Sequence, residues 1–199
     1  MLRLLIATAN TGKLHEIQSL LAGLDLEVLL PASIGLQLEV VEDGDTYREN
    51  AAKKALAYAR ASGLLSLADD SGLEVDTLNG QPGLHSARFS PLPGATDADR
   101  RSYLLQRLSG KPRPWLAHFH CTAALANAQG EIWFAEGDCP GEILPVERGS
   151  NGFGYDPLFL VSEHGKTMAE LSMEEKNRLS HRARAILAAR PLIENLCYY

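Results

Sequence analysis

Two adjacent carboxylates, Asp69 and Asp70, are the residues of this chain whose types and spacing most directly suggest chemistry. They follow an apolar run over 64–68 and precede a Ser-Gly pair, so we expect them where a strand enters a turn. Strand ends of this kind hold ligands in α/β sheets, and a carboxylate pair suits Mg²⁺, which prefers oxygen ligands and accompanies phosphates. The same segment is also ordinary turn chemistry, in which the aspartates accept hydrogen bonds from nearby backbone N–H groups. The local sequence leaves both interpretations open.

A second candidate segment, from Thr8 to Lys13, lies between an expected first strand and an expected first helix. Backbone N–H groups and a helix N-terminus there can face an anion, and Lys13 adds a positive charge. The segment lacks the glycine pattern of a P-loop or of a dinucleotide fingerprint. A turn followed by a solvated lysine is the alternative.

Aromatic rings stand among glycines from Gly149 to Pro157, where the backbone can approach a flat ligand and Phe153 or Tyr155 can stack on it. A purine is such a ligand, and a ring that fills the core is the alternative. Further along the chain, Lys176 precedes Ser180-His181-Arg182, either on one helix or around a break at Asn177. These donors can bind a ligand, or they can form a solvated basic helix surface.

Two weaker candidates are acidic or histidine pairs. Glu42 and Asp43 can supply another metal oxygen, although acidic surface loops are common. His118 and His120 share one face of an expected strand. No third ligand is near them in sequence, so a structural role is favoured over metal binding.

The elements expected to position these residues alternate between strands and helices. We expect strands near 2–7, 26–30, 64–68, 115–124 and 131–135, the last two as an antiparallel hairpin, so the sheet should be mixed. Helices are expected from about 14 to 21, 46 to 61 and 96 to 108, and from Ser172 to just before Pro191, with capping boxes at Thr46 and Ser172. The Gly- and Pro-rich loop over 79–94 is long enough to be a functional flap. Residues 1–199 contain no repeat or linker, so we expect a single domain.

Composition restricts the partners of this 199-residue chain. Its net charge of −6 argues against sequence-independent binding of nucleic acid, and no run of about 18 apolar residues predicts a membrane span. The first residues are typical of a strand and not of a signal peptide. Cys121, Cys139 and Cys197 lack the spacing of a zinc site or a disulfide framework, so we expect a cytoplasmic protein.

Together, the motifs resemble those of the inosine triphosphate pyrophosphatase family, also called XTP/dITP diphosphatases. In the order and spacing of that family stand Thr8-x-Asn10-x-x-Lys13, Glu49-Asn50-Ala51, Ala68-Asp69-Asp70-Ser71-Gly72-Leu73, Pro82-Gly83-x-x-Ser86-Ala87-Arg88, Phe153-Gly154-Tyr155-Asp156-Pro157 and Ser180-His181-Arg182. The resemblance runs from about residue 3 to residue 190. Two local departures, Ala9 where many relatives have Gly and the sequence over 90–93, remove no charged group.

This resemblance implies an elongated α/β fold, with a mixed β-sheet flanked by helices and two lobes around a deep cleft. It implies a homodimeric enzyme that uses Mg²⁺ to hydrolyse ITP, dITP or XTP to the monophosphate and pyrophosphate, which cleanses the nucleotide pool. Asp70 resembles the catalytic base and a metal ligand, and Glu42 resembles the second metal carboxylate. The substrate-binding residues implied are Thr8, Asn10 and Lys13 for the triphosphate, Ser71 for a further contact, Phe153 with Gly154 and Tyr155 at the base, and Asp156, Lys176, His181 and Arg182 around its polar edge.

The chemistry of the bases agrees with this assignment. Hypoxanthine and xanthine present a carbonyl oxygen where adenine presents an amino group, so donors such as Lys176, His181 and Arg182 would pair with the first two and oppose adenine. Two alternatives are a triphosphate pyrophosphatase for pyrimidine or modified nucleotides and a non-catalytic nucleotide-binding module. The set of Asp70, Glu42 and Lys13 argues against the second, because a pure binder has no need for metal and nucleophile groups.

Overall fold

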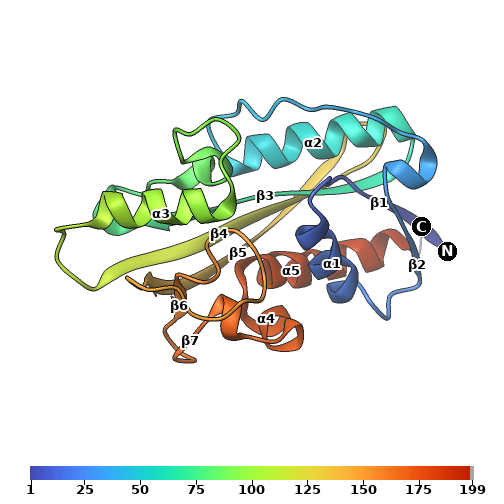
Figure 1. Cartoon of the computed structure of the whole chain (residues 1–199). Helices are drawn as coiled ribbons and strands as arrows, with labels where there is room; N and C mark the ends of the chain where they lie inside the picture. Colours follow the sequence, from blue (N-terminus) through green and yellow to red (C-terminus); the bar gives the residue numbers. More distant parts are fainter. Residues whose placement is uncertain (198–199) are drawn as a thin grey trace. The chain divides into compact units, whose positions relative to one another are not determined.

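The fold combines helices with one seven-stranded sheet, as seen in a computed structural model that describes residues 1–197 except the side chain of Cys197 (Figure 1). The strands are β1 (Leu2–Ile6), β2 (Leu26–Leu29), β3 (Leu65–Val75), β4 (Trp115–Ala126), β5 (Ile132–Ile143), β6 (Phe159–Val161) and β7 (Lys166–Thr167). The helices are α1 (Thr11–Leu20), α2 (Tyr47–Ser62), α3 (Asp97–Leu108), α4 (Met173–Leu179) and α5 (His181–Cys197). Short 3₁₀ segments cover Ala32–Ile34, Asp76–Leu78, Gly83–Arg88 and Met168–Glu170.

The sheet has the strand order β2-β1-β3-β4-β5-β6-β7. Strand β1 runs parallel to β2 and to β3, whereas β6 is antiparallel to β5 and to β7. The parallel pairs require crossover connections, which contain α1 and α2. The predicted α/β fold class with a mixed sheet is therefore confirmed.

The backbone divides into two compact units, each assembled from separate stretches of the chain. Unit 1 comprises Met1–Asp70, Cys121–Gly137 and the chain from His181 onward, and unit 2 comprises Ser71–His120 and Asp138–Ser180. Strands β3, β4 and β5 each contribute residues to both. The expectation of a single domain over 1–199 stays a prediction.

Unit 1 buries apolar side chains on both faces of its strands. Helix α1 lies against α5 (Figure 1), and Ile17 and Ile186 from these helices join Leu67 of β3 in one cluster. A second cluster consists of small residues of α2 and the strands, namely Ala7, Ala51, Ala55, Ala59, Ala68, Ala124 and Ala126. Leu67 and Ala68 belong to different clusters because successive residues of a strand point to opposite faces.

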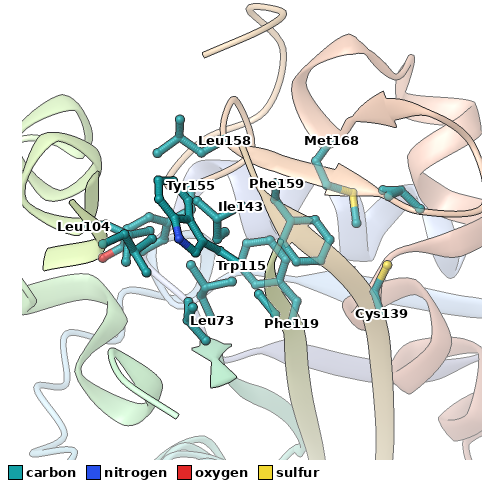
Figure 2. Packing of buried hydrophobic residues seen from close by; sticks show 14 of the residues in the cluster. Leu73, Leu104, Trp115, Phe119, Cys139, Ile143, Tyr155, Leu158, Phe159 and Met168 are labelled. Atoms are coloured by element: carbon teal, nitrogen blue, oxygen red, sulfur yellow. The ribbon is translucent and has the colours of Figure 1, made fainter. Parts of the chain in front are cut away.

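Unit 2 has an aromatic core. Figure 2 shows Phe119 and Phe159 close together in this core, and their ring centroids are 4.5 Å apart. Leu104 and Leu108 of α3 are fully buried in the same cluster. This helix begins at a capping box in which Thr96 and Asp99 exchange hydrogen bonds, so its apolar face is held against the core from the first turn.

The predicted strand over 64–68 is too short, and the predicted turn at Asp69 and Asp70 is wrong. Strand β3 continues through both aspartates to Val75, because Leu73 and Val75 are fully buried in the core of unit 2. Strand β5 likewise continues beyond the predicted residue 135 to Ile143, which is fully buried. Strands β6 and β7 were not predicted, because they are too short to show a periodic pattern.

Two predicted helix features also need correction. The last helical region breaks at Ser180 and not at Asn177, which lies inside α4. It then continues as α5 with Pro191 inside it, because the fully buried Ile193 keeps the chain helical beyond the proline. At the start of α2, Thr46 caps the helix as predicted, but the Glu49 carboxylate accepts a hydrogen bond from the backbone N–H of Asp45 and not from that of Thr46. Within residues 1–197 no helix is both long and apolar enough to cross a membrane.

Candidate active site

Asp69 and Asp70 lie inside β3, so their side chains point to opposite faces of the strand. The Asp69 carboxylate meets Lys13 of α1 and Arg182 of α5, on the face to which Leu67 also points. The Asp70 carboxylate points to the other face and meets Asn50 of α2. Strand geometry therefore gives two neighbouring carboxylates different environments.

Asp69 is a buried anion held by cations. Its Oδ2 lies 2.9 Å from Lys13 Nζ and 3.2 Å from Arg182 Nε. Burial alone would raise the pKa of Asp69, but Lys13 and Arg182 hold this pKa well below its ordinary value. Arg182 is itself 2% exposed and also donates to the buried Glu16 carboxylate. Asp69 is therefore ionised and fixes the position of the Lys13 ammonium group.

Asp70 has the opposite electrostatic character. Burial raises the pKa of Asp70, and the nearby negative charge of Glu42 raises it further, against the lowering effects of Lys54, Lys13 and the Asn50 hydrogen bond. A pair of carboxylates whose pKa values are pushed apart can divide their roles, and the one with the higher pKa is the better proton acceptor. Asp70 is thus the group suited to a general base.

Lys54 joins the acidic groups on the α2 side. Its Nζ lies 2.7 Å from Glu42 Oε1 and donates to the backbone oxygen of Asp69 at 2.6 Å. Burial alone would lower the pKa of Lys54, but Asp69 and Glu42 raise it above its ordinary value. No role was predicted for Lys54 from the sequence. Its spacing of four residues from Asn50, which places both on one helix face, was the available signal.

Glu42 and Asp70 have the chemistry of a divalent-cation site. Their negative charges interact, and carboxylate oxygens are the ligands that Mg²⁺ prefers. Across residues 1–197 no group of three or more His, Cys, Asp or Glu side chains is arranged to hold a metal ion. One or two carboxylates are sufficient where a substrate supplies phosphate oxygens, so these two residues fit such an ion.

The histidines of β4 have acidic neighbours of their own. His118 Nε2 lies 3.4 Å from Glu74 Oε2, and His120 Nδ1 lies 2.7 Å from Asp138 Oδ1. These pairs agree with the structural role that the sequence favoured.

The segment from Thr8 to Lys13 starts α1. The Asn10 side chain caps the helix by accepting from the Lys13 backbone N–H at 3.1 Å, and Thr8 Oγ1 accepts from the Asn10 N–H at 3.2 Å. Asn10 and Thr11 are exposed, so the first turn of this ten-residue helix faces solvent. The strand, loop and helix predicted for this segment are confirmed, and its contact with a phosphate stays a prediction.

In unit 2, Phe153 lies beside a buried ion pair. The Asp156 Oδ2 atom accepts from Lys176 Nζ at 2.6 Å and from the Phe153 N–H at 3.0 Å. Lys176 Nζ also lies 5.1 Å from the centre of the partly exposed Phe153 ring. A Cβ atom at Gly152, whose φ is +74°, would lie 2.0 Å from Asp156 Oδ2, so only glycine fits there. The structure thus brings Phe153, Asp156 and Lys176 together.

Helix α3 holds the backbone next to this ring. Asp97 Oδ2 accepts from the Gly154 N–H at 2.8 Å, and Arg101 Nη1 donates to the Gly154 oxygen at 2.8 Å. Tyr155 belongs to the aromatic core (Figure 2), where burial raises the pKa of its phenol and the hydroxyl donates to the Ser86 oxygen at 2.9 Å. Tyr155 therefore anchors the loop to the core, and its contact with a ligand stays a prediction.

The predicted site residues are divided between the two units. Unit 1 contains Thr8, Asn10, Lys13, Glu42, Asp70, His181 and Arg182, and unit 2 contains Ser71, Phe153, Gly154, Tyr155, Asp156 and Lys176. His181 is 5% exposed at the start of α5. Arg182 forms ion pairs with Glu16 and Asp69, which make it an anchor of these buried carboxylates, and its role at the edge of a base stays a prediction.

Comparison with known proteins gives consistent matches. Residues 4–192 match the model of the Ham1 family. A protein of Desulfotalea psychrophila named dITP/XTP pyrophosphatase is 48% identical over 92% of this chain and 81% of its own length. A protein of Geobacter sulfurreducens with the same name is 49% identical over 94% of each chain. These matches confirm the resemblance inferred from the motifs.

Solved structures give the same result. A HAM1 protein from Coxiella burnetii has a TM-score of 0.87 and 39% identity, with all of both chains covered. A nucleoside-triphosphatase, also named dITP/XTP pyrophosphatase, from Mycobacterium abscessus has a TM-score of 0.72 and 37% identity, with 98% of each chain covered.

Proposed function

Because the chain belongs to the Ham1 family, we propose that it hydrolyses the deaminated purine nucleoside triphosphates ITP, dITP and XTP to the nucleoside monophosphate and pyrophosphate. It is a hydrolase that acts on triphosphates, and curated relatives over nearly its whole length are named dITP/XTP pyrophosphatases. The observation that carries the mechanism is the pair Asp69 and Asp70, whose pKa values move in opposite directions beside two lysines.

The reaction needs a water molecule to attack the α-phosphorus. In our proposal the Asp70 carboxylate accepts a proton from that water while the water oxygen forms a bond to the α-phosphorus. The bond between the α-phosphorus and the bridging oxygen breaks, and pyrophosphate leaves with the electron pair. Lys13 and Lys54 stabilise the negative charge that develops on the phosphate oxygens, and Asp69 keeps Lys13 in position. Thr8 and Asn10 extend the triphosphate contact at the exposed start of α1.

Mg²⁺ is the ion that we propose for this reaction, with Glu42 and Asp70 as its carboxylate ligands. A divalent cation supplies charge neutralisation and polarises phosphoryl oxygens when it is bound. The charge of Glu42 is balanced by Lys54 at 2.7 Å, so the protein holds both carboxylates near each other without a large net negative charge.

Base recognition is assigned to the Phe153 loop. The ring stacks on the purine, with Gly154 and Tyr155 fixing the loop and Ser71 adding a contact. Lys176, oriented by Asp156, donates to the carbonyl oxygen that distinguishes hypoxanthine and xanthine from adenine. As the family resemblance implies, His181 and Arg182 supply further donors to the base. A buried donor that faces an adenine amino group is left unpaired, which costs about 1–3 kcal/mol.

We also infer a homodimer in the cytoplasm, as the family resemblance implies. Size-exclusion chromatography with light scattering should give twice the 21.6 kDa mass of the chain. A mass of one chain across micromolar concentrations would contradict the dimer.

The test of the proposed function is a substrate panel. We expect pyrophosphate release from ITP, dITP and XTP to have a kcat/KM at least tenfold above that for ATP, whose 6-amino group opposes the Lys176 donor, and to stop in EDTA. A preference for dTTP and UTP would favour the pyrimidine alternative. Tight nucleotide binding without turnover would favour a binding module.

A further inference from the structure

Asn50 of α2 occupies a central place between the two acidic groups, yet the mechanism above gives it no role. It is 2% exposed, and both ends of its amide are hydrogen bonded. Its Nδ2 donates to Asp70 Oδ2 at 3.0 Å, and its Oδ1 accepts from the backbone N–H of Gly44 at 2.8 Å. Gly44 stands two residues after Glu42. One amide group therefore connects Asp70 to the segment that carries Glu42.

We propose that Asn50 is a positioning residue that holds the Glu42 segment and the Asp70 carboxylate in a fixed relation to each other. This inference rests on the proposed function, because it concerns the placement of that reaction's acidic groups. The protein atoms on which it depends all lie in unit 1.

The chemistry of the amide explains why asparagine is required. An ionised carboxylate only accepts hydrogen bonds, and a backbone N–H only donates. The amide has one donor end and one acceptor end, so it satisfies both partners in a single orientation. Aspartate at position 50 would place an acceptor against Asp70, and leucine would leave the Gly44 N–H without this acceptor.

Close packing at Gly44 limits how far this segment can move. A Cβ atom there would lie 2.8 Å from Asn50 Oδ1 and 2.8 Å from Glu49 Cβ. The Glu49 carboxylate also accepts from the Asp45 N–H at 2.7 Å. The first turn of α2 thus holds two successive N–H groups of the segment, and the absence of a side chain at Gly44 permits the approach.

The consequence concerns turnover more than binding. Groups that orient a catalytic or metal-binding carboxylate commonly contribute a factor of about 10 to 100 in activity when they are removed. Phe153 and Lys13 lie outside this hydrogen-bond chain, so substrate binding should change little. Loss of Asn50 should therefore reduce kcat and leave KM nearly constant.

The test uses Asn50→Leu, Gly44→Ala and the double variant, with Tyr58→Phe as the matched control. Tyr58 lies on the same helix, and its hydroxyl donates to the Leu38 oxygen at 2.9 Å, so the control also removes a hydrogen bond between α2 and the preceding loop. We would measure kcat and KM for ITP, the urea unfolding midpoint, and the hydrogen-exchange rate of the Gly44 amide by NMR.

We expect Asn50→Leu to lower kcat by about 10- to 100-fold, with KM within about threefold, and to accelerate Gly44 exchange at least tenfold. Gly44→Ala should also lower kcat. The double variant should have a kcat no lower than that of the more affected single variant, because both changes disrupt the same hydrogen bond between Gly44 and Asn50. Tyr58→Phe should keep the wild-type kcat. If Asn50→Leu does not fold, Gly44→Ala decides the question.

A kcat within threefold of the control for each folded variant, or a rise in KM at constant kcat, would overturn the inference. Failure of the wild-type protein to hydrolyse ITP would instead reject the proposed function. In that case the Gly44 exchange rate still tests the link, and an unchanged rate in Asn50→Leu would reject it.

Discussion

At the residue scale, the alternation of β3 explains how two neighbouring aspartates come to have different tasks. Asp69 points toward Lys13 and Arg182 and stays ionised, whereas Asp70 points toward α2 and has a raised pKa. A turn would have left both carboxylates to cap backbone N–H groups. The strand instead fixes each on its own face, so a fixed anion and a proton acceptor stand side by side.

Asp70→Asn should abolish turnover while nucleotide binding stays measurable. The amide keeps nearly the same shape but cannot accept a proton from water, so kcat for ITP should fall by about 10²- to 10⁴-fold. Steady-state kinetics and calorimetric binding of ITP would check this. Turnover close to that of the wild type would remove Asp70 from the role of base.

Asp69→Asn should lower the free energy of unfolding by about 3–5 kcal/mol at pH 7, because Lys13 and Arg182 lose a buried anion. In the wild-type protein the depressed pKa of Asp69 contributes stability above the unfolded-state pKa of about 4, and this contribution is lost as the pH falls below that value. The stability difference between the two proteins should therefore shrink below pH 4. Urea titrations from pH 3 to pH 7 that give a constant difference would contradict this.

At the element scale, α3 controls the loop that carries Phe153. A capping box stabilises the N-terminal end of this helix. Asp97 accepts a hydrogen bond from the Gly154 N–H, and Arg101 donates one to the Gly154 carbonyl oxygen. The position of the Phe153 ring therefore depends on a helix that contains none of the predicted site residues.

Asp97→Ala should raise KM for ITP about threefold to tenfold, as expected for one lost hydrogen bond to the loop. The kcat should change little, because the carboxylate group near Lys13 is untouched. Asp99→Ala is the matched control, since Asp99 caps the same helix without contacting Gly154. Equal changes in KM for the two variants would show that helix stability, and not loop position, is responsible.

Helix α5 contains a proline in its interior. Pro191 has no N–H for the helical hydrogen bond to residue 187, and its side chain is exposed. Pro191→Ala should therefore raise the free energy of unfolding by about 1–3 kcal/mol. Urea denaturation would measure the change, and a loss of stability would mean that the proline ring makes contacts that outweigh the missing bond.

At the scale of the whole molecule, the sequence predicted most elements but not their ends. Short-range signals were sufficient for α1, for the mixed sheet, for the start of α3 and for the capping box at Ser172, because these depend on periodicity and on a few neighbours. The length of β3 depends on Leu73 and Val75 entering a core made by distant segments. The continuation of α5 past Pro191 depends in the same way on the burial of Ile193.

The candidate site likewise combines residues that the sequence identifies with contacts that only the fold creates. The family resemblance was sufficient to select Glu42, Asp70 and Lys176 as candidates, but it did not show which partner holds each side chain. Lys54 and Asn50 owe their contacts to the approach of α2 to β3, where small residues such as Ala51, Ala55 and Ala68 permit close packing. The spacing of Asn50 and Lys54 places both on one helix face, but their partners on β3 arise from the fold and cannot be read from neighbouring residues.

The central claim is that water attacks the α-phosphorus of a deaminated purine triphosphate. The measurement that tests it most directly is hydrolysis of ITP by the wild-type protein in ¹⁸O-labelled water, with both products analysed by mass spectrometry. We predict one labelled oxygen in inosine monophosphate and none in pyrophosphate. Label in pyrophosphate, or release of labelled orthophosphate, would place the attack at another phosphorus and contradict the account.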